Sequence, residues 1–185
     1  MNMYEKIKSL AKEYFPETVQ TRRDFHKYAE RGWLEMRTAS IVARKLNNLG
    51  YQVLVGKELM CETARMGLPS KRVLTLNYKR AILQGADPYY LEKVKDGFTA
   101  VAGIIKNGDG PVVAIRFDMD ALSIMEDDSA DHNPGKFGFI SCNPGAMHAC
   151  GHDGHTAMGL TVAKILSEIK EHLHGTLKLI FQPAE

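Results

Sequence analysis

A short segment late in the chain concentrates side chains that bind metal ions. Residues 146–157 read AMHACGHDGHTA and hold three histidines, one cysteine and one aspartate. Imidazole nitrogen and thiolate sulfur suit borderline-soft divalent ions such as Zn²⁺, and a nearby carboxylate can ligate, orient a ligand or bridge to a second ion. The segment therefore predicts a metal site of the kind that metal-dependent hydrolases use.

Within this segment the first candidate ligands are Cys150 and His152. In an extended stretch the two side chains point to the same side, so they can approach one ion or flank a position between two ions. Gly151 and Gly154 add the flexible backbone that close approach to an ion requires. A structural zinc clip is the other metal interpretation, but it usually uses spaced cysteine pairs, and the chain has no C-x-x-C.

Acidic residues follow two of the expected strands and could converge on the same site. Asp118 and Asp120 come after one apolar run, and Glu185 comes after another. A carboxylate that is hydrogen-bonded to a ligating histidine fixes its tautomer and raises its basicity. The alternative is that Asp118 and Asp120 only form a turn at the strand end.

Composition limits the classes of protein that fit. The 185 residues are 44% hydrophobic and 25% charged, with a net charge of +2. This predicts a globular fold of one or two domains and favours neither nucleic acid nor a membrane as partner. The three cysteines, without a signal peptide, favour a reducing compartment, so we expect a cytoplasmic protein.

The elements that must position these residues alternate between helix and strand. We expect an amphipathic helix at the N-terminus, two helices within 18–49 separated near Gly32, and a short strand at 51–55. Residues 57–96 are polar, with two short helical patterns. Two β-rich runs, 98–105 and 111–117, are joined by Asn-Gly-Asp-Gly, which predicts an antiparallel hairpin.

The metal-binding segment should begin a helix that leads into a final strand. Asp153 is the expected cap of this helix, and 176–181 is the expected strand. The expected buried face of the helix is Met158, Val162, Ile165, Leu166 and Ile169. The order of elements predicts an α/β fold with a mixed sheet flanked by helices. Because the sequence stops directly after this strand, we expect a severed chain.

Four stretches together resemble the M20 metallopeptidase family. They are RRDFHKYAERGWLEMRTASIVARKLNNLGYQV at 22–53, AIRFDMDALSI at 114–124, MHACGHDGHTAMGL at 147–160 and LKLIFQPAE at 177–185. The similarity is to the amidohydrolase branch of the family, which contains aminoacylases and auxin-conjugate hydrolases. MGLP at 66–69, the long segment between 51 and 98, and SCNPGAMHACGHDGHTA most resemble the enzymes that hydrolyse aminobenzoyl-glutamate.

The resemblance implies a two-metal site, with Zn²⁺ or Mn²⁺, that hydrolyses an amide between an acyl group and an amino acid. Cys150 and His152 match metal ligands. Asp120 matches the site aspartate that orients a histidine ligand in related enzymes. Asp118 stands where other branches carry a ligand histidine. Glu185 matches the general base, which takes a proton from water and later gives it to the leaving amine.

The resemblance also implies that much of the family's fold lies outside these residues. Residues 1–185 correspond to the N-terminal portion of a zinc-peptidase-like catalytic domain, with an insertion at about 57–96. The lid, the rest of the catalytic domain and further ligands, beginning with a second glutamate after Glu185, are expected beyond it. We therefore expect this polypeptide to be inactive by itself, and the alternative is a non-catalytic fragment that folds without chemistry.

The resemblance indicates only the general class of the substrate and of the partner. The substrate would be a small N-acyl amino acid, and the insertion favours folate catabolites such as aminobenzoyl-glutamate. The resemblance implies that a full-length form is a homodimer or a heterodimer with a homologous subunit.

Overall fold

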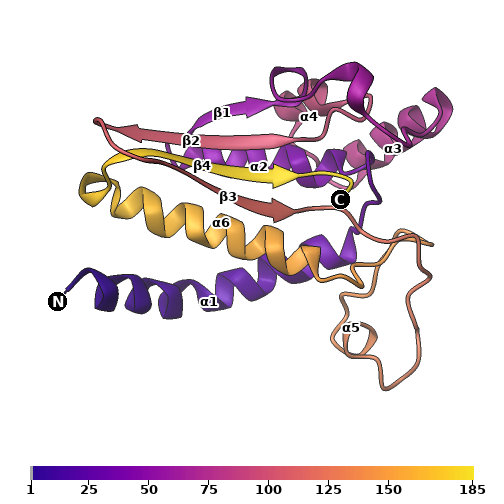
Figure 1. Ribbon diagram of the computed structural model, residues 1–185. Helices are drawn as coiled ribbons and strands as arrows, with labels where there is room; N and C mark the ends of the chain where they lie inside the picture. Colours follow the sequence, from indigo (N-terminus) through magenta and orange to yellow (C-terminus); the bar gives the residue numbers. More distant parts are fainter. Residues whose placement is uncertain (1) are drawn as a thin grey trace.

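The computed structural model describes residues 2–185 and shows helices packed on a four-stranded sheet (Figure 1). In chain order the main elements are α1 (Met3–Lys27), α2 (Met36–Asn48), β1 (Gln52–Val55), α3 (Lys71–Leu83), α4 (Pro88–Val94), β2 (Val101–Asn107), β3 (Val112–Asp118), α5 (Asn133–Lys136), α6 (His152–Glu168) and β4 (Gly175–Gln182). Short 3₁₀ turns lie at Gly56–Glu58, Glu62–Ala64 and Lys170–His172. The predicted α/β class with a mixed sheet is confirmed.

The last strand in sequence lies inside the sheet. The strand order is β1-β2-β4-β3, and β4 pairs antiparallel with β2 and parallel with β3 (Figure 1). Because β3 and β4 run parallel, their carboxyl ends meet at the same edge of the sheet. Asp118 is accordingly in register with Gln182.

The predicted hairpin between the two β-rich runs is wrong, because β4 lies between β2 and β3. The connection that follows Asn107 passes over the start of β4. A Cβ atom on Gly110 would lie 2.9 Å from the Gly175 nitrogen, and one on Gly175 would lie 2.2 Å from the Pro111 oxygen. The turn-forming glycines therefore mark a close backbone crossing and not a two-stranded hairpin.

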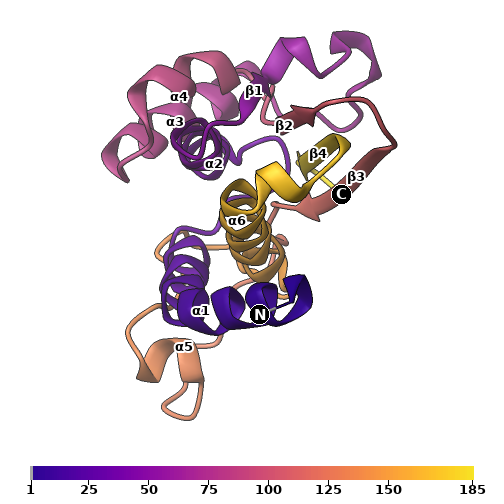
Figure 2. The same cartoon turned by 90° about the vertical axis from the view of Figure 1, so that its left-hand side faces the viewer.

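The helices form two layers behind one face of the sheet. Figure 2 shows α2 and α6 beside the strands, with α1 further out against α6. The main core lies between α2, α6 and the sheet, and its largest fully buried side chains include Phe25, Met36, Leu46, Leu179 and Phe181. Gly159 allows α6 to lie close to the strands, because a Cβ atom there would be 2.7 Å from the Phe117 ring.

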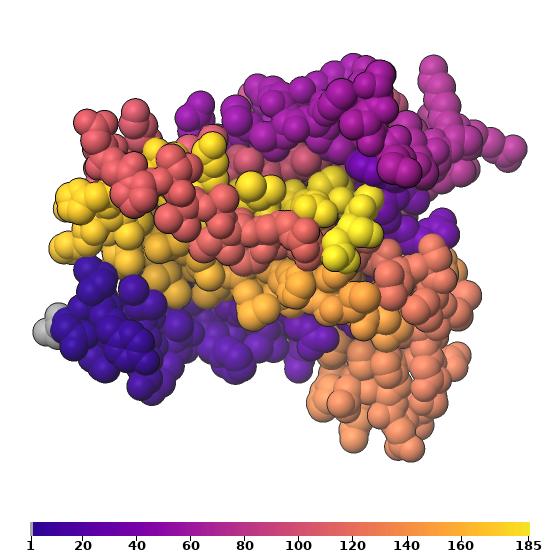
Figure 3. Space-filling view, in the orientation of Figure 1, coloured from indigo at the N-terminus to yellow at the C-terminus, as the bar shows by residue number. Residues whose placement is uncertain are grey.

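The opposite face of the sheet has no helix over it in the described part of the chain. Figure 3 looks onto this face, where β3 and β4 reach the surface. Along β3, residues 112–116 are exposed and apolar except for Arg116. No described helix is both long and apolar enough to cross a bilayer.

Three details of the helices differ from expectation. The N-terminal helix and the next expected one form a single helix, α1, which continues through Pro16, and the chain leaves helical geometry only around residues 28–35. In α6 the capping residue is Gly151 instead of Asp153. Met158 is exposed, whereas Ile165 and Ile169 are buried as expected and Val162 and Leu166 are partly buried. Contact with both the sheet and α1 buries additional positions of α6, such as Thr156 and Leu160.

Candidate active site

Three chain segments bring the candidate residues to one place. Asp118 ends β3, His152 begins α6, and Glu185 follows β4. The parallel pairing of β3 with β4 puts two of these ends at one sheet edge, and α6 packs against both strands. Such an edge, beyond the carboxyl ends of strands, is where α/β proteins commonly bind ligands.

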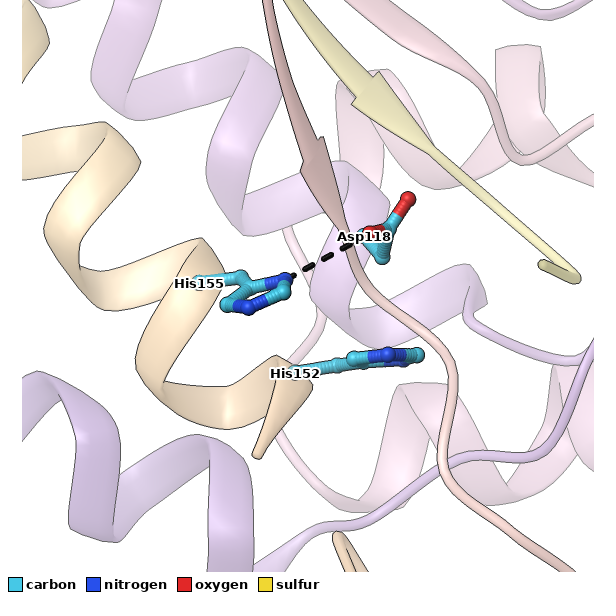
Figure 4. A group of neighbouring side chains, drawn as sticks. All are labelled: Asp118, His152 and His155. Carbon is cyan, nitrogen blue, oxygen red and sulfur yellow. Dashed lines mark ion pairs between the residues drawn. The ribbon is translucent and has the colours of Figure 1, made fainter. Parts of the chain in front are cut away.

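Asp118, His152 and His155 form a group that could hold a metal ion. Each offers one ligand atom, and these atoms all lie within 4.8 Å of one another. Figure 4 shows both imidazole rings reaching from α6 toward the end of β3. The His155 Nδ1 atom is 3.4 Å from Asp118 Oδ2, and the two rings are stacked with centroids 5.2 Å apart. One carboxylate and two imidazoles suit Zn²⁺ or Mn²⁺.

Asp120 determines which nitrogen of His152 is free. His152 Nδ1 lies 2.9 Å from the Asp120 backbone oxygen and 3.2 Å from its Oδ1 atom. Both of these atoms are acceptors, so the proton belongs on Nδ1 and the Nε2 lone pair can bind an ion. Glu185 Oε2 lies 3.9 Å from Nε2.

The Asp118 carboxylate retains acceptor capacity. Its Oδ1 atom is buried and has no hydrogen-bond partner, although Arg116 Nε lies 3.2 Å away. A buried carboxylate oxygen without a hydrogen bond is costly unless a cation compensates it. The atom therefore fits a ligand position, and Arg116 supplies part of the compensating charge.

The backbone before Glu185 is held by two buried carboxyl groups. The Glu185 N–H donates to Asp120 Oδ1 at 3.3 Å, and the Ala184 N–H donates to Glu35 Oε1 at 2.9 Å. Glu35 is fully buried and also accepts from Thr99 Oγ1. Burial raises the pKa of Glu35 to about 8, so its carboxyl group is largely protonated at neutral pH. The side chain of Glu185 itself is about half exposed.

Cys150 lies outside the group formed by Asp118, His152 and His155. Its side chain is exposed. The expected extended geometry is wrong because Gly151 has a φ of 81° and His152 is already helical. The two residues therefore do not share one extended stretch, on which the expectation of side chains on the same side rests.

A second, buried network joins α1 to the metal-binding segment. His26 Nδ1 lies 2.8 Å from Asp153 Oδ2, and its Nε2 lies 2.7 Å from Glu126 Oε1. Burial works against a charge on His26, but the hydrogen bonds with the two carboxylates outweigh it and raise the pKa of His26. Nearby His148 is different, because burial lowers its pKa to about 4 and neither ring nitrogen has a hydrogen-bond partner.

Sequence reasoning misses His155 as a member of the group that could hold a metal ion. His155 follows His152 by three residues, a spacing that puts both side chains on one face of a helix. The expectation from the sequence is an extended segment, and in an extended segment this spacing does not bring the two side chains to one side. The pairing of His26 with Asp153 is missed as well. His26 and Asp153 are 127 positions apart, so no local sequence pattern predicts their contact.

Comparisons with known proteins identify relatives of the chain. Residues 114–185 match the model of peptidase family M20/M25/M40. One subunit of the p-aminobenzoyl-glutamate hydrolase of Escherichia coli is 47% identical over 98% of the chain and 42% of its own length. The indole-3-acetyl-aspartic acid hydrolase of Enterobacter agglomerans is 49% identical over 94% of the chain and 40% of its own length. The chain thus spans about two fifths of the length of each of these two relatives.

Solved structures agree with these relatives. The aminobenzoyl-glutamate utilization protein of Klebsiella pneumoniae matches 97% of the chain and 39% of its own chain, with a TM-score of 0.79 and 38% identity. A dinuclear metal binding peptidase from the M20 family of Bacillus subtilis matches 94% of the chain and 36% of its own chain, with a TM-score of 0.64 and 30% identity. The resemblance stated from the sequence motifs is confirmed.

Proposed function

From the premise that this chain belongs to the M20 peptidase family, we propose that its whole protein hydrolyses the amide bond of an N-acyl amino acid. Two relatives that are nearly half identical are named for substrates with an aromatic acyl group and an acidic amino acid. We propose the same class here, with p-aminobenzoyl-glutamate as the first compound to test.

The observation that carries this proposal is the meeting of Asp118, His152 and His155 beside Glu185. These three side chains would hold one divalent ion, Zn²⁺ or Mn²⁺, and Cys150 remains a proposed ligand for a second ion. Bound ions of this kind polarise a carbonyl group and lower the pKa of water. The contacts of Asp120 with His152 Nδ1 leave Nε2 free, and this atom would bind the ion.

In the proposed reaction Glu185 is the general base. It takes a proton from the attacking water and returns it to the nitrogen of the leaving amino acid. Its position follows from backbone hydrogen bonds with Asp120 and, through Ala184, with Glu35. A half-exposed carboxylate at this place can reach both water and substrate.

We propose that a polypeptide of these 185 residues alone does not turn over substrate. The group found in the structure supplies three protein ligands, whereas a dinuclear site requires more. The proposal that residues 1–185 are the N-terminal portion of a catalytic domain, with an insertion at about 57–96, accounts for the missing ligands. Dimer formation by the whole protein and a cytoplasmic location are further parts of the proposal.

The test uses the full-length protein loaded with Zn²⁺ or Mn²⁺. We expect Glu185→Gln to lower kcat by at least about 100-fold, because it removes the general base, while metal content stays unchanged. His152→Ala should lose both metal and activity, and Cys150→Ser should lose about half of the metal, because it removes a ligand of the second ion. Elemental analysis and p-aminobenzoyl-glutamate hydrolysis measure the two quantities.

Glu171→Gln is the matched control, because Glu171 is exposed on the 3₁₀ turn after α6. It should change neither metal content nor turnover. Full activity in Glu185→Gln would exclude the assigned role of that residue. Hydrolysis that persists after complete metal removal would overturn the proposed reaction class.

A further inference from the structure

A cavity of about 550 Å³ opens beside Asp120 and Glu185. Its other walls come from the turn at residues 31–34 and from residues 67–73 of the insertion. We propose that this cavity is the acyl-group subsite and that it takes an aromatic ring, with Trp33 as the residue that selects it. This inference rests on the proposed function, since it names the substrate group that lies next to Glu185.

Trp33 has the features of a residue held in place for binding. It lines the cavity, and its φ of 65° lies in the left-handed region, which a bulky side chain rarely adopts. Such backbone strain persists only where surrounding structure enforces it, and it clusters at binding and catalytic sites. Ala184, with a φ of 48°, lies on the same cavity.

The contacts of the turn explain how Trp33 is held. Its Nε1 atom donates to the Met66 backbone oxygen at 2.8 Å, which joins the turn to the insertion. Gly32 lies directly against Ala184, because a Cβ atom on Gly32 would be 3.1 Å from the Ala184 Cβ. The indole is therefore fixed to the insertion through Met66, and the backbone of the turn, at Gly32, lies against the residue before Glu185.

The lining of the cavity combines apolar side chains, which suit an aromatic ring, with the charged residues Arg31, Asp120 and Glu185. Pro69, Val73 and Leu122 add apolar surface to the indole of Trp33. Aromatic rings gain stacking or edge contacts with an indole beyond their area burial. The volume lies within the range of small-molecule sites and exceeds what one ring needs, which leaves room for a ring substituent.

The experiment exploits the fact that Trp33 is the sole tryptophan of the chain. The ¹⁵N-labelled 185-residue chain therefore has one indole N–H resonance, which is followed during titration with benzamide. Benzamide presents a neutral aromatic acyl group and needs neither metal nor turnover. We expect a saturable shift with a Kd of about 1 mM, the range for so small a ligand. Cyclohexanecarboxamide should bind about 2- to 10-fold more weakly, and acetamide should cause no shift.

Ser123→Phe tests the location, because Ser123 is exposed on the cavity wall and the added ring fills the space. It should abolish the benzamide shift and retain the folded spectrum. Ser9→Phe, the same change at an exposed position of α1, should leave the shift intact. No saturable shift in the wild-type chain, equal affinity for the three amides, or undiminished binding in Ser123→Phe would overturn the subsite. If the metal-loaded full-length protein does not hydrolyse N-acyl amino acids although the chain binds benzamide, the proposed function is overturned and the subsite is not.

Discussion

At the scale of single residues, buried carboxyl groups organise the site. Asp120 touches both His152 and the Glu185 backbone, and Glu35 holds Ala184. Neither group forms an ion pair with Lys or Arg in the described chain, and burial raises the pKa of Glu35. Glu35 gives the clearest consequence.

We predict that Glu35 makes the folded state less stable as pH rises. Burial raises its pKa from 4.5 to about 8, so the folded chain keeps a proton that the unfolded chain releases. The unfolding free energy should therefore lose a contribution of about 1.4 kcal/mol per pH unit between these two values and level off above the higher one. Urea unfolding across this pH range measures the slope.

Glu35→Gln should remove that slope, because Gln can still accept from the Ala184 N–H and has no proton to lose. Glu171→Gln is the control and should leave the slope in place, since Glu171 is exposed. Identical pH profiles for wild type and Glu35→Gln would contradict the prediction.

Residue types predict much of the candidate site, but they do not predict the directions in which the side chains point. Asp118, Asp120, His152 and Glu185 stand out in the sequence because acids and imidazoles follow apolar runs, and the structure brings them together. Cys150 is exposed and is not part of the group, and the chain leaves extended geometry at Gly151, which has a positive φ.

At the scale of elements, most helices and strands follow from periodicity, but the pairing of strands does not. The Asn-Gly-Asp-Gly stretch satisfies a hairpin rule, yet β4 enters between its two arms. Both arrangements place β2 and β3 antiparallel with a tight connection. Which arrangement forms depends on β4, which begins more than 50 residues after β3 ends. A short stretch of sequence around the turn therefore cannot predict the pairing.

The packing of α6 on the sheet predicts a contrast between two glycines of this helix. Gly159→Ala should lower the unfolding free energy by about 1–3 kcal/mol, because the new methyl group would overlap Phe117 and Phe181. Gly154→Ala should raise it by up to about 1 kcal/mol, because nothing lies within 4 Å and alanine favours helix. Chemical denaturation measures the unfolding free energy of both variants. Equal changes in the two variants would show that α6 is not closely packed on the strands at Gly159.

At the scale of the whole molecule, β4 joins otherwise separate parts. β1 and β2 form one antiparallel pair, and β3 contacts the sheet only through β4. The candidate site depends on the same strand, because β4 carries Ala184 and Glu185 to Glu35 and Asp120. Sheet and site are thus expected to form together.

A chain that ends at His174 tests this dependence. Without β4 the β1–β2 pair remains but β3 has no partner strand. We expect loss of the cooperative unfolding transition with a reduced β signal in far-ultraviolet circular dichroism. A chain that ends at Gln182 keeps β4 and should still unfold cooperatively. Cooperative unfolding of the shorter chain would show that β3 docks without β4.

The central place of β4 also has a consequence for synthesis on the ribosome. β3 is complete at Asp118, but its partner begins only at Gly175. At translation rates of about 5–20 residues per second, the nascent chain waits roughly 3 to 11 s between these points. During that interval the apolar residues of β3 are unpaired along both edges, so the newborn chain presents a target for chaperones until β4 emerges.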